Sequence, residues 1–465
     1  MTTNHFFRSR LSLVSARVIA ILSVMIGLLI LGGDHGVPRV TYTGSPILSA
    51  RNGQFVFRFS RLMDEKSVED GFRIVPPVSG KFSWIGRTFA FTSDTNLVYG
   101  ERYDVTFATA RDLSNKEMPL TTLSVPVQDQ SWFFLGTQAG QAGRVMHREQ
   151  NSAQPTAITP AHLFVQQYAI SPDGSTLALL ATERSKQTSN NRTDFRLMLW
   201  DRASATLSEP RLNRQWIVDN LTWLPDSSAI AFSYIAFQGP LEGIAQFDLT
   251  SEEVSLLADK KARAFNFAFT PDGSQLLYID VEGAVFLRDL ESAEDTLVTT
   301  VFNDIVGFDA SGEYLAYTMM RSVESFDLTN VPVLLSGSGT ELRVPVPPSS
   351  SFDINFLPGK PQIVWTVEQA IGDIRQDSLY LYDYQTDVLT PLEHRDNATD
   401  IKPAVSADGQ QIAWHRFYND NKGYILSGWN DYQHTLVGGE IWLYDMLTKR
   451  ATNTGDQGAE VQFLP

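Results

Sequence analysis

The sequence predicts an all-β protein in three consecutive parts: an N-terminal transmembrane helix, a β-sandwich and a β-propeller of seven blades, with six blades as the alternative count. Three observations predict this order. An uncharged apolar run follows a basic N-terminus, alternating apolar and polar residues fill residues 38–128, and a turn resembling Pro-Asp-Gly recurs six times between residues 171 and 409. The 28 Phe, 15 Tyr and 31 Gly residues are typical of β structure with many turns.

The composition excludes several classes of function. The chain has 53 acidic and 37 basic residues and a net charge of −16, so its mean field repels phosphate and we expect no nucleic-acid partner. It contains no cysteine. That absence excludes disulfides, thiolate metal sites, a cysteine nucleophile and a lipidated cysteine anchor.

The N-terminal part predicts a membrane anchor. Residues 18–33 carry no charge, and Arg8, Arg10 and Arg17 precede them. As a helix this run spans about 24 Å, and extension back to residue 11 brings it to the roughly 30 Å of a hydrocarbon core. The basic flank predicts a cytoplasmic segment 1–10, a single-pass signal anchor over 11–33 and an extracytoplasmic remainder. A cleaved signal peptide is the alternative.

Beyond that segment the chain is strongly acidic. Setting aside the three arginines leaves 34 basic against 53 acidic residues, a net charge of −19 for the exported part. We therefore expect localisation in the cell membrane with the bulk of the chain outside the cytoplasm.

Residues 38–128, after a linker over 34–37, predict a β-sandwich. Alternating runs begin at Phe55 (FVFRF), Thr88 (TFAF) and Tyr103 (YDVTF), and Gly, Asn, Asp and Pro clusters separate them. This spacing fits about seven short strands. We expect Trp84 and Tyr103 to pack in the core.

Three motifs in this unit resemble the SbsA-type bacterial Ig-like domain. They are FSRLMD from Phe59, the Gly-x-x-x-Trp hairpin that ends at Trp84, and the stretch LVYGERYDV through DLSNKEM that starts at Leu97. Leu62 stands where this family usually has Pro, and Ser114 where it usually has Gly. The resemblance implies a spacer or adhesive module on a cell-envelope protein.

Residues 131–465 repeat one unit of four strands. The repeat turns begin at Ser171, Leu224, Thr270, Asp309, Leu357 and Ser406. Each lies between two apolar strands, where Pro fixes φ and Gly adopts a positive φ. A third strand ends in aspartate at Asp201, Asp248, Asp289, Asp383 and Asp445. Four short strands in every 39–53 residues predict a propeller blade.

The two ends of this region complete one further blade. Residues 459–465 repeat the first strand of a blade, with Leu464 and Pro465 matching Leu224 and Pro225, whereas residues 131–158 contain outer strands only. One split blade added to six whole ones gives seven. The repeats resemble TolB-like propellers, which share the Pro-Asp-Gly turn with the propellers of prolyl oligopeptidases. The resemblance is specific for the fold and nearly silent on function, and members commonly have six blades.

Searches for catalytic motifs find none. The chain lacks a GxSxG elbow, an HExxH helix, a phosphate-binding loop, a GxGxxG turn and a calcium loop. Its seven histidines form no HxH or HxxxH pair. We therefore assign no catalytic residue, metal site or cofactor. The turn aspartates Asp173, Asp226, Asp272 and Asp408 are expected to accept hydrogen bonds from their own turns rather than to form a carboxylate ring.

Long insertions gather on one face of the predicted disc. The turns after strands one and three define a tight-turn face, and the connections after strands two and four define a long-loop face. The long connections span residues 183–194, 336–351, 367–377 and 415–439, all on the long-loop face. Binding residues of rigid scaffolds usually lie on such loops.

The insertion over residues 415–439, in the sixth repeat and hence in blade six, contains the candidate binding residues. They are Phe417, Tyr418, Tyr424, Trp429 and Tyr432, with His415 and His434. Such rings suit stacking on a sugar or anchoring a protein partner, with Arg416 or Lys422 able to stack on them. The alternative is a hairpin extension whose rings pack on their own blade.

The sequence thus predicts a non-catalytic binding or assembly protein of the cell envelope with an envelope protein as partner. A sensor of glycan or peptide ligands is one alternative. A propeller enzyme resembling a lyase or lactonase, with a site in the channel, is the other, and it requires matched polar residues at the starts of the inner strands. The residues found there are unlike one another: Gln166, Asn220, Asn266, Asp304, Asp353 and Lys402.

Overall fold

The computed structural model describes residues 36–465, with gaps, and four residues before them. The gaps are 52, 187–193, 214, 237–241, 260–261, 281, 300–303, 310, 323–326, 338, 345–353, 372–373, 394, 396–397, 419–427, 431–434 and 438. The expected membrane segment 11–33 lies outside the described residues except for Val18, Ile19, Leu22 and Ser23. Among the residues that are described, no helix is long and apolar enough to cross a membrane.

The first unit is a seven-stranded sandwich. One sheet has the order β1-β2-β5-β4 and the other β3-β6-β7. Their bounds are β1 Val40–Tyr42, β2 Gln54–Phe59, β3 Phe72–Val75, β4 Gly80–Ile85, β5 Thr88–Ser93, β6 Arg102–Phe107 and β7 Thr121–Pro126, and the helix α2, Glu65–Gly71, connects β2 to β3. The strand number agrees with the alternation in the sequence, whereas membership of the Ig-like family stays a prediction.

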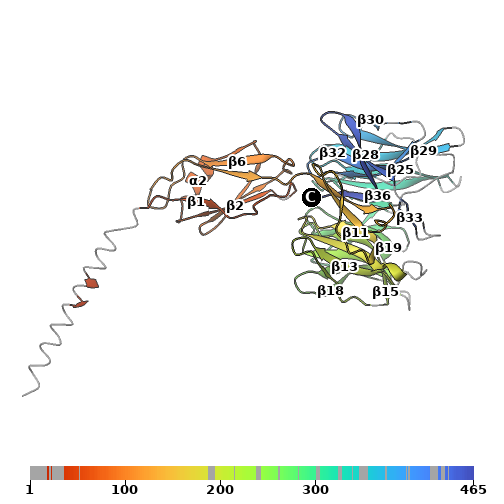
Figure 1. Ribbon diagram of the computed structural model, residues 1–465, viewed down its shortest axis with the longest axis horizontal. Coiled ribbons are helices and arrows are strands. Elements are labelled where there is room, and N and C mark those ends of the chain that lie inside the picture. The colour runs from red at the N-terminus through yellow and green to blue at the C-terminus, as the bar shows by residue number, and fades with distance from the viewer. Residues whose placement is uncertain are drawn as a thin grey trace, which may run out of the picture.

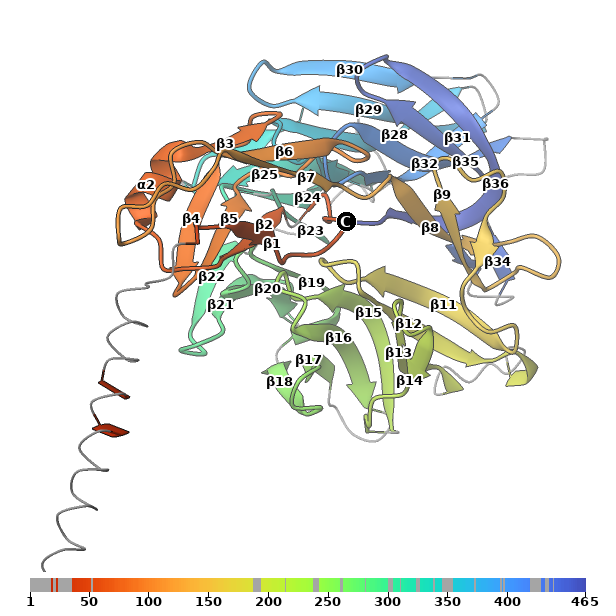
Figure 2. The ribbon, with the colours of Figure 1, turned by 60° about the vertical axis from the view of Figure 1, so that its left-hand side comes forward.

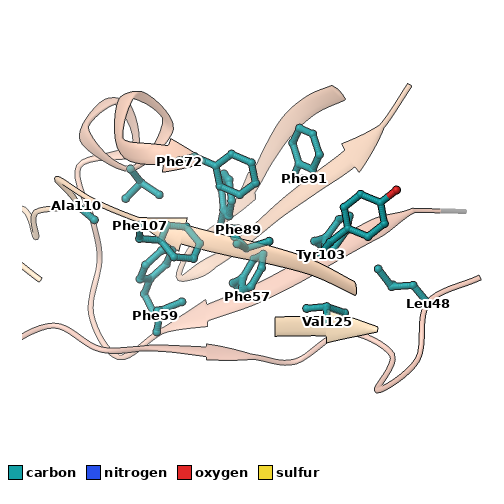
Figure 3. Close-up of a cluster of buried hydrophobic side chains, with 14 of the residues drawn as sticks. Leu48, Phe57, Phe59, Phe72, Phe89, Phe91, Tyr103, Phe107, Ala110 and Val125 are labelled. Carbon is teal, nitrogen blue, oxygen red and sulfur yellow. The ribbon is translucent and has the colours of Figure 1, made fainter. Parts of the chain in front are cut away.

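Aromatic rings fill the space between the two sheets (Figure 3). In β2 the alternation turns Phe55, Phe57 and Phe59 inward, and all three are buried. The rings of Phe57 and Phe107 meet edge to face at 5.2 Å between centroids, a favourable geometry for aromatic pairs. Tyr103 is also buried, as predicted.

The second unit consists of antiparallel four-stranded sheets that follow one another along the chain. The first three are β11 Leu163–Ile170, β12 Thr176–Glu183, β13 Arg196–Asp201 and β14 Thr206–Ser208; β15 Trp216–Trp223, β16 Ala229–Ala236, β17 Glu242–Asp248 and β18 Val254–Asp259; and β19 Ala262–Phe269, β20 Gln275–Asp280, β21 Val285–Asp289 and β22 Asp295–Thr299. The next two are β23 Asp304–Phe308, β24 Tyr314–Ser322, β25 Asp327–Ser336 and β26 Glu341–Arg343; and β27 Ile354–Phe356, β28 Gln362–Ile371, β29 Ile374–Asp383 and β30 Val388–Glu393.

The remaining strands form one seven-stranded sheet that comprises two blades. Its members are β31 Ala398–Val405, β32 Gln411–Tyr418, β35 Gly439–Asp445, β36 Arg450–Phe463, β8 Ser131–Gly136, β9 Val145–Glu149 and β10 Thr156–Ala157. The first half of β36 pairs with β35 as the outer strand of blade six, and its second half pairs with β8 as the inner strand of blade seven. The predicted split blade is therefore present.

The inner strands of successive sheets contact one another from β11 through β15, β19, β23, β27 and β31 to β36. The amide of Gln462 on β36 donates to the carbonyl of Tyr168 on β11 at 3.0 Å and so joins the last inner strand to the first. The sheets are arranged around a common centre as the blades of a propeller (Figure 2). Strand β36 passes from one blade to the next at Gly458, which pairs with both β35 and β8. Glycine is needed there because a Cβ would lie 2.3 Å from the ring of Phe134.

The turn chemistry inferred from the repeats is confirmed. Asp173 accepts the amide of Ser175 at 3.0 Å, and Asp226, Asp272 and Asp408 accept equivalent bonds from the residue two positions later. The five predicted strand-ending aspartates also end their strands. The fourth residue after each has a positive φ, namely Ala205, Glu252, Ala293, Asp387 and Lys449.

One predicted loop proves to be a longer hairpin. Residues 367–377 were expected to connect two strands of blade five, but β28 and β29 continue to pair through this stretch up to Ile371 and Ile374. Extended pairing satisfies backbone groups that a loop would leave to solvent. The described part of the insertion in blade five is therefore an extension of the β28–β29 hairpin.

The sandwich docks on the tight-turn face of the propeller. The hydroxyl of Ser49 donates to the carbonyl of Pro465 at 2.9 Å, and the side chains of Tyr99, Gln128 and Asn96 donate to the carbonyls of Leu464, Pro465 and Ala407. Both views place the C-terminus between the two units (Figures 1 and 2). The face opposite the sandwich is the long-loop face.

Candidate binding site on blade six and the inner strands

The structure separates the candidate binding residues of blade six. His415 and Phe417 on β32 are buried, so they belong to the blade rather than to a binding surface. Tyr418, at the end of the same strand, is 47% exposed. Tyr424, Tyr432 and His434 lie outside the described residues, and Trp429 is placed only as part of the backbone of β33, Gly428–Asn430, which pairs with β34, Thr435–Val437.

A buried ion pair lies at the base of this insertion. Arg416 on β32 and Asp400 on β31 are direct cross-strand partners. The guanidinium donates twice to the carboxylate, from Nε to Oδ1 and from Nη2 to Oδ2, both at 2.7 Å. The side chain of Arg416 is fully buried and that of Asp400 nearly so. Such a two-pronged bond fixes the orientation of both groups.

Two tryptophans surround the guanidinium of Arg416. It lies 4.3 Å from the ring centroid of Trp442 and 5.6 Å from that of Trp414. The indole of Trp414 donates to Asp400 at 2.8 Å. Among the described residues, the rings on which Arg416 stacks belong to the blade itself.

The exposed side of this network is polar. Arg395 lies 4.7 Å from the centroid of Trp442, and the indole of Trp442 donates to Glu440 at 3.2 Å. Glu440 also accepts the amide of Asn453 at 2.8 Å. At the long-loop end of blade six, Tyr418 and the half-exposed Arg395 therefore reach the surface, whereas Trp442, 5% exposed, lies beneath it. Surfaces of that composition are enriched at the centres of protein interfaces.

His415 supports the neighbouring blade. Its Nε2 accepts the backbone N–H of Val461 at 3.1 Å, where β36 bulges away from β8. Burial lowers the pKa of His415 to about 4, so the ring is neutral at physiological pH. Its Nδ1 is buried and has no partner among the described residues. The histidine ring thus accepts the N–H of Val461, a backbone group that the bulge removes from the hydrogen-bonded pairing of β36 with β8.

The inner strands contain bulges at equivalent positions. Asn220, Lys402 and Glu460 each lie four residues before a repeat turn, and each adopts a positive φ, of 49°, 51° and 54°. A left-handed backbone costs a residue other than glycine about 1–2 kcal/mol. Bulges of this kind redirect side chains and are common beside binding sites.

Two of these bulges carry an ion pair between blades. The ammonium of Lys402 on β31 donates to the carboxylate of Glu460 on β36. Although burial opposes ionisation, Lys402 holds the pKa of Glu460 below its ordinary value. The hydroxyl of Tyr168 on β11 donates to the backbone carbonyl of Glu460. Blades one, six and seven are thereby joined at their inner strands.

Of the six polar residues at the starts of the inner strands, the structure describes three side chains. Gln166, Asn220 and Lys402 have described side chains, Asn266 and Asp304 have only described backbone, and Asp353 lies outside the described residues. Within the described part of the chain, no three histidine or acidic side chains are grouped so as to hold a metal ion. Among the described groups, Lys402 pairs with Glu460 of the next blade, and the amide of Asn220 donates to the hydroxyl of Ser233 in its own blade at 3.4 Å.

A cleft of about 660 Å³ separates the sandwich from the tight-turn face. Asp94 and Asn96 line it from the sandwich, and Glu313, Lys360 and Tyr384 line it from the propeller. The ammonium of Lys360 donates to the carbonyl of Gly409 at 2.7 Å, and burial lowers its pKa. The two units therefore touch around a hollow lined by polar and charged side chains rather than over a continuous apolar interface.

This interface predicts a measurable change in mobility between the units. The Asn96→Ala, Tyr99→Phe double variant removes two of the side-chain bonds to the propeller, each contributing about 1 kcal/mol, and we expect a broader range of orientations. Spin labels on Cys introduced at Ile85 and Leu447 measure it as a wider distance distribution in this cysteine-free chain. Tyr42→Phe, whose hydroxyl bonds only within the sandwich to Ser45, is the control. Equal widths in both variants would show that these bonds do not set the orientation.

No protein-family model matches the sequence, and no curated protein matches it. Solved structures with a similar fold include TolB from Acinetobacter baumannii, at 12% identity and a TM-score of 0.42, covering 85% of this chain and 83% of that one. An oligogalacturonate lyase from Vibrio parahaemolyticus has 10% identity and a TM-score of 0.45, covering 70% and 84%. The β-propeller domain of the Trilobed protease from Pyrococcus furiosus has 11% identity and a TM-score of 0.48, covering 77% and 93%. TolB-like and other propellers, enzymes among them, are thus similar in fold, and this does not decide whether the chain is an enzyme.

Proposed function

We propose that the chain is a membrane-anchored, non-catalytic binding or assembly protein of the cell envelope. In this proposal the N-terminal segment 11–33 anchors it, the sandwich is a stalk of the SbsA-type Ig-like family, and the long-loop face of the propeller holds a protein partner. The observation that carries the proposal is the docking of the sandwich on the tight-turn face through the carbonyls of Ala407, Leu464 and Pro465. That contact leaves the opposite face, with the long insertions, turned away from the stalk.

The composition of the long-loop end of blade six supports a protein partner. Tyr418 is exposed there, and the buried pair of Arg416 and Asp400 holds Trp442 in a fixed orientation behind it. An exposed tyrosine on a strand that is fixed in this way loses little conformational entropy on binding. The absence of a catalytic motif in the sequence favours binding over chemistry.

A cross-linking experiment tests the proposal. The chain contains no cysteine, so Tyr418→Cys and Leu447→Cys each provide a single thiol for a photo-activated cross-linker, one on the long-loop face and one on the tight-turn face. In gently solubilised membranes we expect Tyr418→Cys to capture one envelope protein in near-stoichiometric yield, and Leu447→Cys to capture it at least about tenfold less, as for a site outside the interface. Equal capture at both sites, or none at either, would remove the support for a partner on this face.

A further inference from the structure

The end of the sandwich remote from the propeller exposes apolar side chains. Strand β2 ends there, and α2 follows it (Figure 1). Five large apolar residues at this end are between 47% and 83% exposed: Val37, Leu62, Ile85, Leu113 and Leu120. We call these five residues the apolar tip. Scattered exposed apolar residues are common, but several at one end of a domain mark an interaction surface.

Backbone hydrogen bonds show that the segments bearing these residues lie together. The amide of Ser60 donates to the carbonyl of Arg39 at 2.9 Å, which brings the start of β1 beside the end of β2. The amide of Phe59 donates to the carbonyl of Arg87, in the turn that follows Ile85. The amide of Leu113 donates to the carbonyl of Leu62 at 3.2 Å. The tip is therefore one surface, built from the start of the sandwich and from the connections between β2 and β3, β4 and β5, and β6 and β7.

Charged groups surround the apolar tip. Arg39, Arg87 and Arg111 are exposed, and Arg61 is partly exposed. Acidic groups are present as well: Asp112 is paired with Arg61 at 3.3 Å, Glu117 with Arg111 at 3.4 Å, and Glu65 begins α2. Arginines beside exposed leucine and isoleucine suit the headgroup layer of a bilayer, where the stem lies in an apolar environment and the guanidinium meets phosphate.

The short linker before the sandwich indicates what this surface contacts. Only residues 34–37 separate the apolar segment 11–33 from the start of the sandwich at Pro38 and Arg39. Four residues span at most about 14 Å, and the headgroup layer on each side of the hydrocarbon core is about 5–8 Å thick. If residues 11–33 span the membrane, this linker holds the tip of the sandwich at the bilayer surface.

We propose that the apolar tip rests in the interface of the phospholipid bilayer, so that the sandwich is a stalk with a membrane-embedded foot. The inference depends on the anchoring role proposed above for residues 11–33. It gives the sandwich a defined orientation, because contact at the tip and the anchor together prevent it from tilting freely. The propeller is then held with its long-loop face directed away from the membrane.

The absence of cysteine permits a clean test on the full chain. Ile85 and Leu447 are both 83% exposed, but Ile85 lies on the apolar tip and Leu447 on the propeller. Each is replaced by Cys, labelled with an environment-sensitive fluorophore, and the protein is reconstituted into phosphatidylcholine and phosphatidylglycerol vesicles with a quencher on the acyl chains. We expect the Ile85→Cys label to emit at shorter wavelength and to lose about half or more of its intensity to the quencher, as for groups buried about 5–10 Å in the interface. The Leu447→Cys label should show neither change.

The outcomes separate this inference from the proposed anchoring. Protein that fails to float with the vesicles overturns both. Protein that floats but leaves the two labels indistinguishable overturns only the membrane contact of the tip. A blue-shifted Ile85→Cys label that the quencher does not reach indicates contact with a second copy of the chain, and also overturns it. Adding Leu113→Glu, at a site 70% exposed and thus outside the core, should reduce the quenching at least about twofold, because a carboxylate resists entry into the interface.

Discussion

Replacement of Arg416 by methionine is expected to lower the free energy of unfolding by about 3–5 kcal/mol, the usual cost of leaving one buried charge without its partner. Asp400 is 2% exposed and receives two of its hydrogen bonds from Arg416. Burial already raises the pKa of Asp400, and the loss of the guanidinium would raise it further. Urea denaturation followed by tryptophan fluorescence measures the change.

Two further variants make this expectation specific. Arg416 also lies 3.4 Å from a carboxylate oxygen of Glu393, and Arg395 donates to the same oxygen at 3.1 Å and stacks on Trp442 as well. Because the side chain of Arg395 is half exposed, Arg395→Met should lower the free energy of unfolding by less than about 1 kcal/mol. Replacing both members of the pair, with Arg416→Met and Asp400→Leu, should restore much of the stability, because no buried charge remains. If Arg395→Met proves as harmful as Arg416→Met, burial of the pair is not the source of the effect.

Stability should also fall as the pH decreases from about 6.5 towards 4. The pKa of His415 is lowered by burial from 6.5 to about 4, so between these values the unfolded chain binds a proton that the folded chain does not. The folded state is therefore fully favoured above pH 6.5 and loses about 3 kcal/mol from this group by pH 4. Protonation would also turn Nε2 into a donor and break its bond to the amide of Val461.

His415→Gln isolates the contribution of this residue. A glutamine oxygen can accept the same amide but does not titrate, so the variant should show a shallower dependence of unfolding free energy on pH between 6.5 and 4.5. A second histidine, the partly buried His147, also has its pKa lowered to about 4 by burial and remains in both proteins, so it cancels in the comparison. Parallel pH curves for the variant and the parent chain would contradict this role of His415.

The propeller was predictable because its signals are local. Each repeat turn is specified by at least two of proline, aspartate and glycine within four residues, and the strands beside it follow from alternation. The split blade followed from the same periodicity, since the strand ending at Leu464 matches the one ending at Leu224. The sandwich core followed from the alternation in strands such as β2.

The pair of Arg416 and Asp400 was not predicted, although a signal for it exists. The two residues stand eight positions on either side of Asp408 in the turn between β31 and β32. If the pairing of Ala404 with Ala413 continued without interruption, Phe417 would face Asp400. The bulge at Lys402 shifts the register by one residue and makes Arg416 the partner instead, and this bulge is not apparent in the sequence. The burial of Phe417 was not predicted for a related reason, because β32 continues three residues beyond His415, to Tyr418, before the insertion begins.

The sequence by itself determined the all-β class, the repeats with their turns, the seven-blade closure and the absence of disulfides. These features depend on turn residues and on alternation, which act over a few neighbouring positions. Only the tertiary structure decided which propeller face the sandwich covers, that Arg416 is buried against two tryptophans, and that His415 supports the bulge of β36. Each of those contacts joins residues dozens to hundreds of positions apart or depends on a shift in strand register, and no local pattern specifies such a meeting.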